Sequence, residues 1–217
     1  SLRVNLMLLG PPGAGKGTQA ARISVDFGLL HLSSGDILRA ERKSLTELGR
    51  KAQDYMDRGV LVPDDLILTM MGDHISRPEA QNGFLLDGFP RTVPQAEGLD
   101  QRLTAGGKRI DAVINIVVSD AEVTRRLTGR WSCPKDGRIY HEVFSPPVQR
   151  GLCDECGTTL TRRKDDEPGV VSQRLVTYHA ETEPLIDYYG RCGVLRTVDG
   201  GMDADIVIGQ PDFFSSL

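Results

Sequence analysis

The chain has 217 residues, of which 39% are hydrophobic and 26% charged, and its formal net charge is −4. These values are typical of a soluble globular protein with one sizeable core. The acidic balance argues against a nucleic-acid partner, and no apolar run approaches the length that spans a bilayer. Residues 1–10 are too short, and too soon followed by glycines, for a signal peptide. We therefore expect a cytoplasmic monomer without membrane or nucleic-acid partners.

Short apolar runs alternate with helical segments along the chain. The pattern predicts strands over residues 4–9, 84–86, 113–118 and 194–198. It predicts helices over residues 16–27 and 46–57, and two more that begin at Ser34 and at Pro63. Two later helices are predicted, one from an Asp120 cap to Leu127 and one over residues 171–189 with a kink at Pro184. Such alternation predicts an α/β domain with a parallel sheet.

Two stretches break this alternation. Residues 33–62 insert helices where a single crossover would be enough, and residues 129–166 combine Gly, Pro, Cys and charged residues with almost no periodicity. We interpret both as excursions from one domain that spans residues 1–217, with a core made of residues 1–32, 63–128 and 167–217. The tail, residues 209–217, has no pattern that predicts a structure.

A phosphate-loop pattern lies between the first predicted strand and the first predicted helix. Residues 10–18 read GPPGAGKGT, with Gly17 where Ser or Thr is usual and Thr18 next. Glycines let consecutive N–H groups surround an anion, the following helix directs its positive end there, and Lys16 adds a mobile cation. A glycine-rich turn with a surface lysine is the alternative, but it leaves the flanking strand and helix unexplained. The motif therefore predicts a site for nucleotide phosphates.

This loop resembles that of the adenylate kinases, and five further motifs resemble the same family in the same order. They are LSSGDILR at residues 32–39, GFLLDGFPRT at 83–92, LTGR at 127–130, RKDD at 163–166 and RLV at 174–176. The similarity extends from Val4 to about Met202. It implies a P-loop parallel sheet flanked by helices, a helical AMP-binding insertion at residues 33–62, and a long lid at residues 129–166.

The reaction that the resemblance implies is reversible transfer of the terminal phosphoryl group of Mg-ATP to AMP, giving two ADP and maintaining the adenine nucleotide balance. Two polyphosphates that meet head to head need several guanidiniums around them. The resemblance implies that the catalytic residues are Lys16, Arg91, Arg126, Arg130, Arg163 and Arg174. Any single arginine could instead be a solvated surface charge, as we expect for Arg125, Arg150 and Arg162.

The resemblance also implies two sets of nucleotide contacts. Those to ATP come from Gly13, Ala14, Gly15, Lys16, Gly17, Thr18, Arg126, Arg130, Ile139, Tyr140 and Met202. Those to AMP come from Ser34, Arg39, Val60, Leu61, Val62, Gly88, Phe89, Pro90, Arg91, Gln95, Arg163 and Arg174. The Gln95 amide offers a donor and an acceptor together, which suits adenine and favours AMP over UMP or CMP. The alternative is that Gln95 is a solvated helix residue.

Asp87 ends a buried apolar strand, at the edge where open α/β sheets place their ligands. A carboxylate there can hold Mg²⁺ through water, and Mg²⁺ bridges phosphate oxygens. A structural or helix-capping carboxylate is the alternative. Asp165 and Asp166 lie among basic residues, where they could tune the arginines or only balance charge, and the sequence leaves this open.

Three of the four cysteines fall within one short stretch. Such clustering predicts a metal site rather than disulfides. Cys133, Cys153 and Cys156 lie on two short turns that suit tetrahedral zinc, and Asp136 is the predicted fourth ligand because it stands where a second cysteine would complete a four-cysteine set. His141 is the rival fourth ligand, and buried cysteines without a metal are the third possibility. Cys192 fits no ligand spacing.

Other function classes were weighed against adenylate kinase. One is a kinase for a different nucleoside monophosphate, and the others are a nucleotide-dependent switch and a zinc nucleic-acid-binding module. A switch would need an effector surface and a water-positioning residue, of which the sequence shows no sign, and the nucleic-acid module would need a basic face. We therefore predict an adenylate kinase with Mg²⁺ and a structural Zn²⁺ as cofactors and with ATP, AMP and ADP as substrates.

Overall fold

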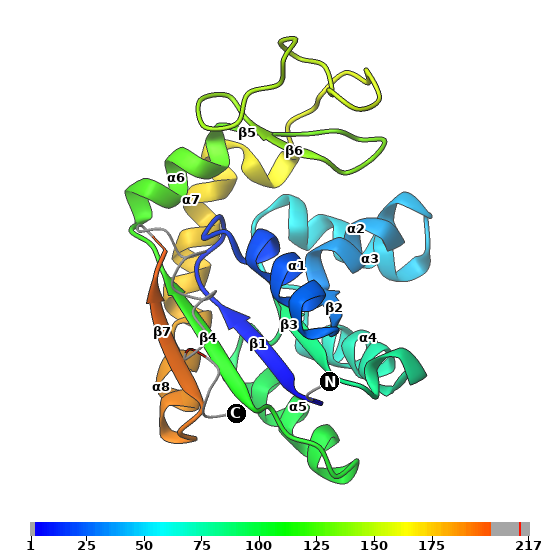
Figure 1. The fold of residues 1–217 in the computed structure, drawn as a ribbon, viewed down its shortest axis with the longest axis vertical. Coiled ribbons are helices and arrows are strands. Elements are labelled where there is room, and N and C mark those ends of the chain that lie inside the picture. The colour runs from blue at the N-terminus through cyan, green and yellow to red at the C-terminus, as the bar shows by residue number, and fades with distance from the viewer. Residues whose placement is uncertain (1–2, 201–212, 214–217) are drawn as a thin grey trace.

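The computed structural model of the chain describes residues 3–200 and Phe213. Its central feature is a parallel sheet of five strands in the order β2-β3-β1-β4-β7 (Figure 1). The strands are β1 (Asn5–Leu9), β2 (Leu30–Ser33), β3 (Phe84–Asp87), β4 (Ala112–Val117) and β7 (Leu195–Asp199). The three central strands are almost wholly apolar because both faces of a parallel sheet are covered.

Helices cover both faces of this sheet. On one face α1 (Lys16–Phe27) packs against alternate residues of the strands. On the other face lie α4 (Asp64–Ser76), α5 (Val93–Ala105) and α8 (Pro184–Arg191), whose apolar side chains join a larger buried cluster. Successive residues of β1 alternate between the two clusters, as the period of two in a strand requires. The core of the molecule is therefore this three-layer arrangement.

The first predicted excursion contains α2 (Ser34–Lys43) and α3 (Glu47–Asp57), which pack against each other. The second starts after α6 (Asp120–Thr128) and returns before α7 (Pro168–Thr177). These two helices share a small buried cluster, so they form a common base for the segment between them. The exact limits of the two excursions, residues 33–62 and 129–166, stay predictions.

The second excursion carries a two-stranded antiparallel sheet of β5 (Arg130–Ser132) and β6 (Ile139–His141). Figure 1 shows this small sheet beyond one end of the molecule, past α6 and α7. A 3₁₀ turn, η2 (Lys164–Asp166), leads from the excursion into α7, and another, η1 (Pro78–Ala80), follows α4. The predicted α/β fold with a parallel sheet is confirmed.

Two details of the predicted helices were wrong. Ser119 rather than Asp120 caps α6, because the Ser119 hydroxyl accepts the N–H of Glu122 while Asp120 is already the first helical residue. The helix predicted over residues 171–189 begins earlier, at Pro168, and is broken into α7, a π-helical turn η3 (Tyr178–Thr182) and α8. The interruption lies at residues 178–182, just before Pro184, where a kink was predicted; proline has no N–H to continue the ladder.

Among the α-helices and strands of the described residues, four were not predicted from the sequence: β2, α5, β5 and β6. Three of them have only three or four residues, which is too short for periodicity to show. Met202 and, except for Phe213, the tail at residues 209–217 lie outside the described residues. Among the helices that are described, none combines the length and the apolar character that crossing a membrane requires.

Candidate active site

A cavity of about 570 Å³ lies at the carboxyl ends of the sheet strands, between the phosphate loop and the two excursions. Parallel strands all end at one edge, so loops from several strands meet there. Most of the predicted site residues line it: Gly13, Gly15, Lys16, Gly17, Thr18, Ser34, Arg39, Val60, Leu61, Val62, Asp87, Gly88, Pro90, Arg91, Gln95, Arg130, Ile139, Arg163 and Arg174. The fold thus brings together residues that are up to 161 positions apart in the chain (13 to 174).

The phosphate loop depends on glycine at two positions. Gly13 and Gly15 have φ angles of 75° and 90°, in the left-handed region that other residues avoid. A Cβ on Gly13 would also lie only 2.7 Å from Cγ of Leu127. Lys16 starts α1, and its Nζ donates to the carbonyl oxygens of Gly10, at 2.9 Å, and Pro11, at 2.8 Å. The ammonium is therefore held over the loop at the positive end of the helix.

Asp87 faces this loop from the end of β3. It is 7% exposed, and its Oδ2 lies 3.4 Å from Nε2 of His31. A Cβ on Gly17 would stand 3.9 Å from the same oxygen, so the carboxylate approaches the first turn of α1 closely. A carboxylate in this position fits the oxygen-ligand chemistry of Mg²⁺. His31 was missed by the sequence analysis because it belongs to the short strand β2.

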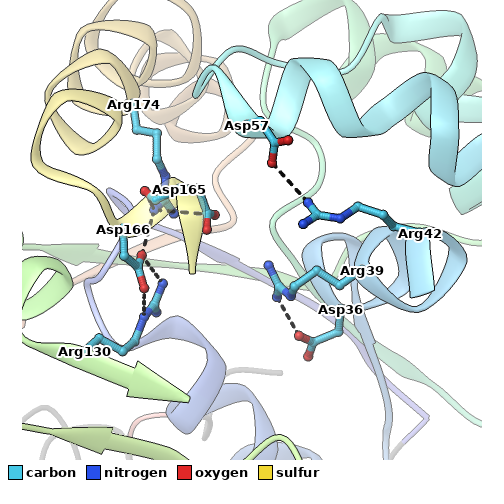
Figure 2. A network of polar contacts seen from close by, with 8 residues as sticks. All are labelled: Asp36, Arg39, Arg42, Asp57, Arg130, Asp165, Asp166 and Arg174. Atoms are coloured by element: carbon cyan, nitrogen blue, oxygen red, sulfur yellow. Dashed lines mark hydrogen bonds and ion pairs between the residues drawn. The ribbon is translucent and has the colours of Figure 1, made fainter. Parts of the chain in front are cut away.

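Directly after Asp87, one main-chain carbonyl positions two predicted residues. The oxygen of Gly88 accepts hydrogen bonds from Ser34 Oγ at 2.7 Å and from Arg91 Nε at 2.6 Å. Arg39, from α2, pairs with Asp36 at 2.6 Å (Figure 2). Arg91 and Arg39 thus reach the cavity from different elements, as binding of a phosphate from two directions requires.

Gln95 lies behind Arg91 and is only 2% exposed. Its Oε1 accepts the Arg91 N–H at 2.8 Å, and its Nε2 donates to Asp64 Oδ1 at 2.8 Å. The alternative of a solvated helix residue is therefore wrong, because the side chain is buried and both ends of its amide are hydrogen-bonded to the protein. A contact between Gln95 and adenine stays a prediction.

A buried carboxylate organises the arginines near the lid. Asp166 is 0% exposed and accepts two hydrogen bonds from Arg130, at 2.8 and 2.7 Å, and one from Arg174, at 3.3 Å. Arg174 also donates to the main-chain oxygen of Asp165 at 2.9 Å. Figure 2 shows both guanidiniums turned toward Asp166, with Arg174 also beside Asp165. Asp166 therefore does more than balance charge, since it fixes the direction of two predicted catalytic side chains.

Four predicted contact residues do not line this cavity. Ala14 and Phe89 are buried in the apolar clusters on the two faces of the sheet, and Tyr140 is buried in the lid with its hydroxyl 3.4 Å from Cys153 Sγ. Arg126 donates to Glu122 and to the main-chain oxygen of Gly200, beside a second hollow that Glu122 helps to line. Their nucleotide contacts stay predictions.

The lid brings the four predicted metal ligands together. One donor atom from each of Cys133, Asp136, Cys153 and Cys156 lies within 4.8 Å of the other three. Asp136 Oδ1 accepts the main-chain N–H of Arg138 at 2.9 Å, while its Oδ2 faces Cys153 Sγ at 3.2 Å. Three sulfurs and one carboxylate oxygen at this spacing form a donor set that suits a metal ion with four ligands, such as zinc.

His141 does not take part in this cluster. Its Nδ1 accepts the N–H groups of Val143 and Phe144, and its Nε2 lies 3.2 Å from the main-chain oxygen of Arg125. Both ring nitrogens therefore have partners away from the cysteines. The geometry favours Asp136 over His141 as the fourth ligand.

Comparison with known proteins decides the family. Residues 8–194 match the adenylate kinase family. The adenylate kinase of Carboxydothermus hydrogenoformans is 51% identical over 197 residues, which cover 91% of this chain and 92% of that protein. The adenylate kinases of Archaeoglobus fulgidus and Desulforudis audaxviator are each 48% identical, over 93% and 99% of both partners, respectively. This chain belongs to the adenylate kinase family.

The chain is accordingly an enzyme with adenylate kinase activity, and the predicted activity is confirmed. The same matches decide against a nucleotide-dependent switch and against a zinc nucleic-acid-binding module. The convergence of a phosphate loop, an aspartate and several guanidiniums on one cavity agrees with a kinase that handles two nucleotides.

Burial shapes the charges of this adenylate kinase site. Burial and, to a smaller extent, neighbouring arginines lower the pKa of Arg91 and of Arg163 to about 10. Both remain cationic at neutral pH. Burial also lowers the pKa of Lys16 to about 7, with Asp87 acting in the opposite direction and Arg91 in the same one. Bound phosphates bring negative charge and restore the protonated form.

We predict that ATP binding takes up a proton at Lys16. A pKa of about 7 leaves the amine largely neutral at pH 8 and largely charged at pH 6, so uptake should be about 0.9 proton at pH 8 and about 0.1 at pH 6 once ATP raises the pKa. Calorimetric titration in buffers of different ionisation enthalpy measures this number. Lys16→Met should remove the uptake, and Lys51→Met, at an exposed lysine, should leave it unchanged. Equal uptake in Lys16→Met and wild type would contradict the assignment.

Proposed function

We propose that this adenylate kinase transfers the terminal phosphoryl group of Mg-ATP to AMP, reversibly, within the cavity at the carboxyl edge of its sheet. The observation that carries the proposal is the convergence of six cationic side chains on that cavity. They are Lys16, Arg39, Arg91, Arg130, Arg163 and Arg174. Phosphoryl transfer asks the protein mainly for positioning and for stabilisation of spread negative charge, and guanidiniums supply both.

On the ATP side, the N–H groups of the phosphate loop and the start of α1 cradle the phosphates. Lys16 turns from the carbonyls of Gly10 and Pro11 to the β- and γ-phosphates, and Arg130 approaches from the lid. Arg126 stacks on adenine beside the second hollow.

On the AMP side, Arg39 and Arg91 hold the acceptor phosphate, and the wall formed by residues 60–62 receives the base. Gln95 reads the adenine edge with the amide hydrogen and lone pair that its two protein bonds leave over. Arg163 and Arg174 act on the transferring group between the two nucleotides. The protein supplies no covalent intermediate, because an oxygen of the AMP phosphate attacks the γ-phosphorus directly, the bond from that phosphorus to the β–γ bridging oxygen breaks, and ADP leaves with that oxygen.

Asp87 is the residue that would hold Mg²⁺ through water, next to the loop. When bound, Mg²⁺ would supply positive charge that neutralises the phosphates. The charge of Asp87 raises the pKa of Lys16 and so favours the ammonium form of that side chain. The position of Asp87 at the end of β3, opposite Gly17, supports this role.

We further propose that residues 33–62 and 129–166 move as an AMP-binding insertion and a lid that close over the cavity and exclude water. Both contribute lining residues, Arg39 from the first and Arg130 from the second. All these residues belong to one chain, so the cavity needs no second copy for its lining. We propose that the enzyme works as a monomer in the cytoplasm. The lid metal is proposed to be one structural Zn²⁺ on Cys133, Asp136, Cys153 and Cys156.

The choice of acceptor tests the proposed reaction directly. With ATP as donor, we expect kcat/KM to be at least about tenfold higher for AMP than for CMP, UMP or GMP. Uracil and guanine present their donor and acceptor in the reverse order to adenine, so they leave the remaining N–H and lone pair of Gln95 unpaired. Cytosine has the same order as adenine but only a single ring, so it fills less of the pocket that receives the base. A coupled assay of ADP formation with each monophosphate measures the ratios. A similar or higher value for any of the other three would show that this chain is not specific for AMP.

Arg91→Ala tests the acceptor-phosphate site. Loss of a buried, forked guanidinium should raise KM for AMP and lower kcat, each by about tenfold or more, while KM for ATP changes little. Steady-state kinetics with each nucleotide varied in turn measures the two effects. Arg150→Ala, at an exposed lid arginine, is the matched control and should behave as wild type. A folded Arg91→Ala with unchanged constants for AMP would remove Arg91 from the site.

Elemental analysis of lid variants tests the metal proposal. Purified protein should contain about one zinc per chain, and Asp136→Ala should lose much of it, while His141→Asn and Glu155→Ala keep it. Asp136→Cys should hold the metal at least as firmly because thiolate is the softer ligand. Chelation should lower the melting temperature, since metal binding contributes to folding of a small module. Loss of zinc in His141→Asn but not in Asp136→Ala would reverse the choice of ligand.

A further inference from the structure

We propose that Asp64 is a positioning residue that locks the orientation of the Gln95 amide and thereby makes the enzyme prefer adenine over 6-oxopurines. The inference rests on the proposed function, in which Gln95 reads the base of AMP. It concerns a residue outside the cavity lining, at the start of a helix on the other side of Gln95.

The lock is a small hydrogen-bonded network between the first turns of α4 and α5. Asp64 Oδ1 accepts from Gln95 Nε2 at 2.8 Å and from Thr92 Oγ1 at 3.2 Å. Thr92 Oγ1 in turn accepts the Gln95 main-chain N–H at 3.2 Å, which caps α5. Gln95 Oε1 accepts the Arg91 N–H at 2.8 Å. Both ends of the amide are therefore held, one by α4 and one by the loop before α5.

The chemistry of the partners permits only one orientation of the amide. An ionised carboxylate accepts hydrogen bonds and cannot donate, and a main-chain N–H donates and cannot accept. Turning the Gln95 amide by 180° would place its oxygen against Asp64 and its NH₂ against the Arg91 N–H. Gln95 is 2% exposed, so water could not repair the two lost bonds. The order of donor and acceptor along this amide is thus fixed by its neighbours.

A fixed order of donor and acceptor on the Gln95 amide matters because purines differ in the order of their own donor and acceptor. Adenine presents an acceptor at N1 and a donor at its 6-amino group, whereas hypoxanthine and guanine present a donor at N1 and an acceptor at the 6-oxo group. After its two protein bonds, Gln95 retains one N–H and one lone pair for a ligand. A freely rotating amide would serve either kind of purine by turning over. A locked amide serves one kind and opposes the other.

Asp65 provides a matched control for this role. It is the next residue, it also lies in the first turn of α4, and its charge interacts with the same helix end. Asp65 is exposed, however, and its carboxylate has no bond to Gln95 or Thr92 among the described contacts. If substitution of Asp64 changes base preference and substitution of Asp65 does not, the change cannot come from loss of a negative charge at the start of α4 alone.

The test compares AMP with inosine monophosphate, which differs from AMP only at N1 and the 6-position of the base. With ATP as donor, Asp64→Ala should lower the AMP-to-inosine-monophosphate ratio of kcat/KM by about tenfold, mainly through KM. Asp64→Asn keeps an acceptor oxygen for Nε2 and should retain most of the ratio. Asp65→Ala should match wild type. An unchanged ratio in a folded Asp64→Ala would overturn the proposal.

Gln95→Leu separates this inference from the proposed function beneath it. If Gln95→Leu no longer discriminates between AMP and inosine monophosphate but Asp64→Ala still does, the proposed role of Asp64 is wrong and Gln95 still reads the base. If Gln95→Leu discriminates as well as wild type, both fail. Asp64→Ala added to Gln95→Leu should lower the ratio no further, and a further loss would show that Asp64 does not act through Gln95. If melting curves show that Asp64→Ala is unfolded, Asp64→Ser takes its place with the same expected ratio.

Discussion

The site depends on holding many like charges around one cavity. Burial lowers the pKa of Arg91 and Arg163 to about 10 and that of Arg174 in the same direction, and each also feels the other arginines. Such a cluster would repel itself without acids among it. Asp166, wholly buried, offsets this by accepting from both Arg130 and Arg174. Nucleotide phosphates would supply the remaining negative charge, so nucleotide binding itself would neutralise the positive charge of the cavity.

The parallel sheet places the chemical groups before any ligand is present. Leu8 pairs with Asp87 between β1 and β3, and Ser33 pairs with Asp87 between β2 and β3. The strands that lead into the phosphate loop, into Asp87 and into α2 therefore end side by side. Because strands at a shared edge cannot slip without turning every side chain to the opposite face, the loop and the carboxylate keep a constant relation. Arg130, on β5, and Arg174, on α7, come from outside this sheet and are held together by Asp166.

The lid shows a different way to stabilise a short segment. Its buried cluster contains only Cys133, Tyr140, Cys153 and Leu160, with Trp131 and Cys156 against it. An apolar group this small is too little for independent stability. Two of its members and their neighbour Cys156 also belong to the four-residue donor set. A metal ion on that donor set would stabilise the lid, as the two large apolar clusters stabilise the sheet.

By itself, the sequence determined the class of fold, the phosphate loop, the family and the residues able to bind metal, because each is written in a local pattern of a few residues. It did not predict the short strands β2, β5 and β6, whose conformation depends on pairing with distant strands. Nor did it show that His31 lies beside Asp87, or that Asp166 joins Arg130 to Arg174. Gln95 was expected to read a base, but its bonds to Asp64 and Arg91 came only from the structure. Only the tertiary structure decided these points, because hydrogen bonds between side chains far apart in the chain leave no periodic pattern in the sequence.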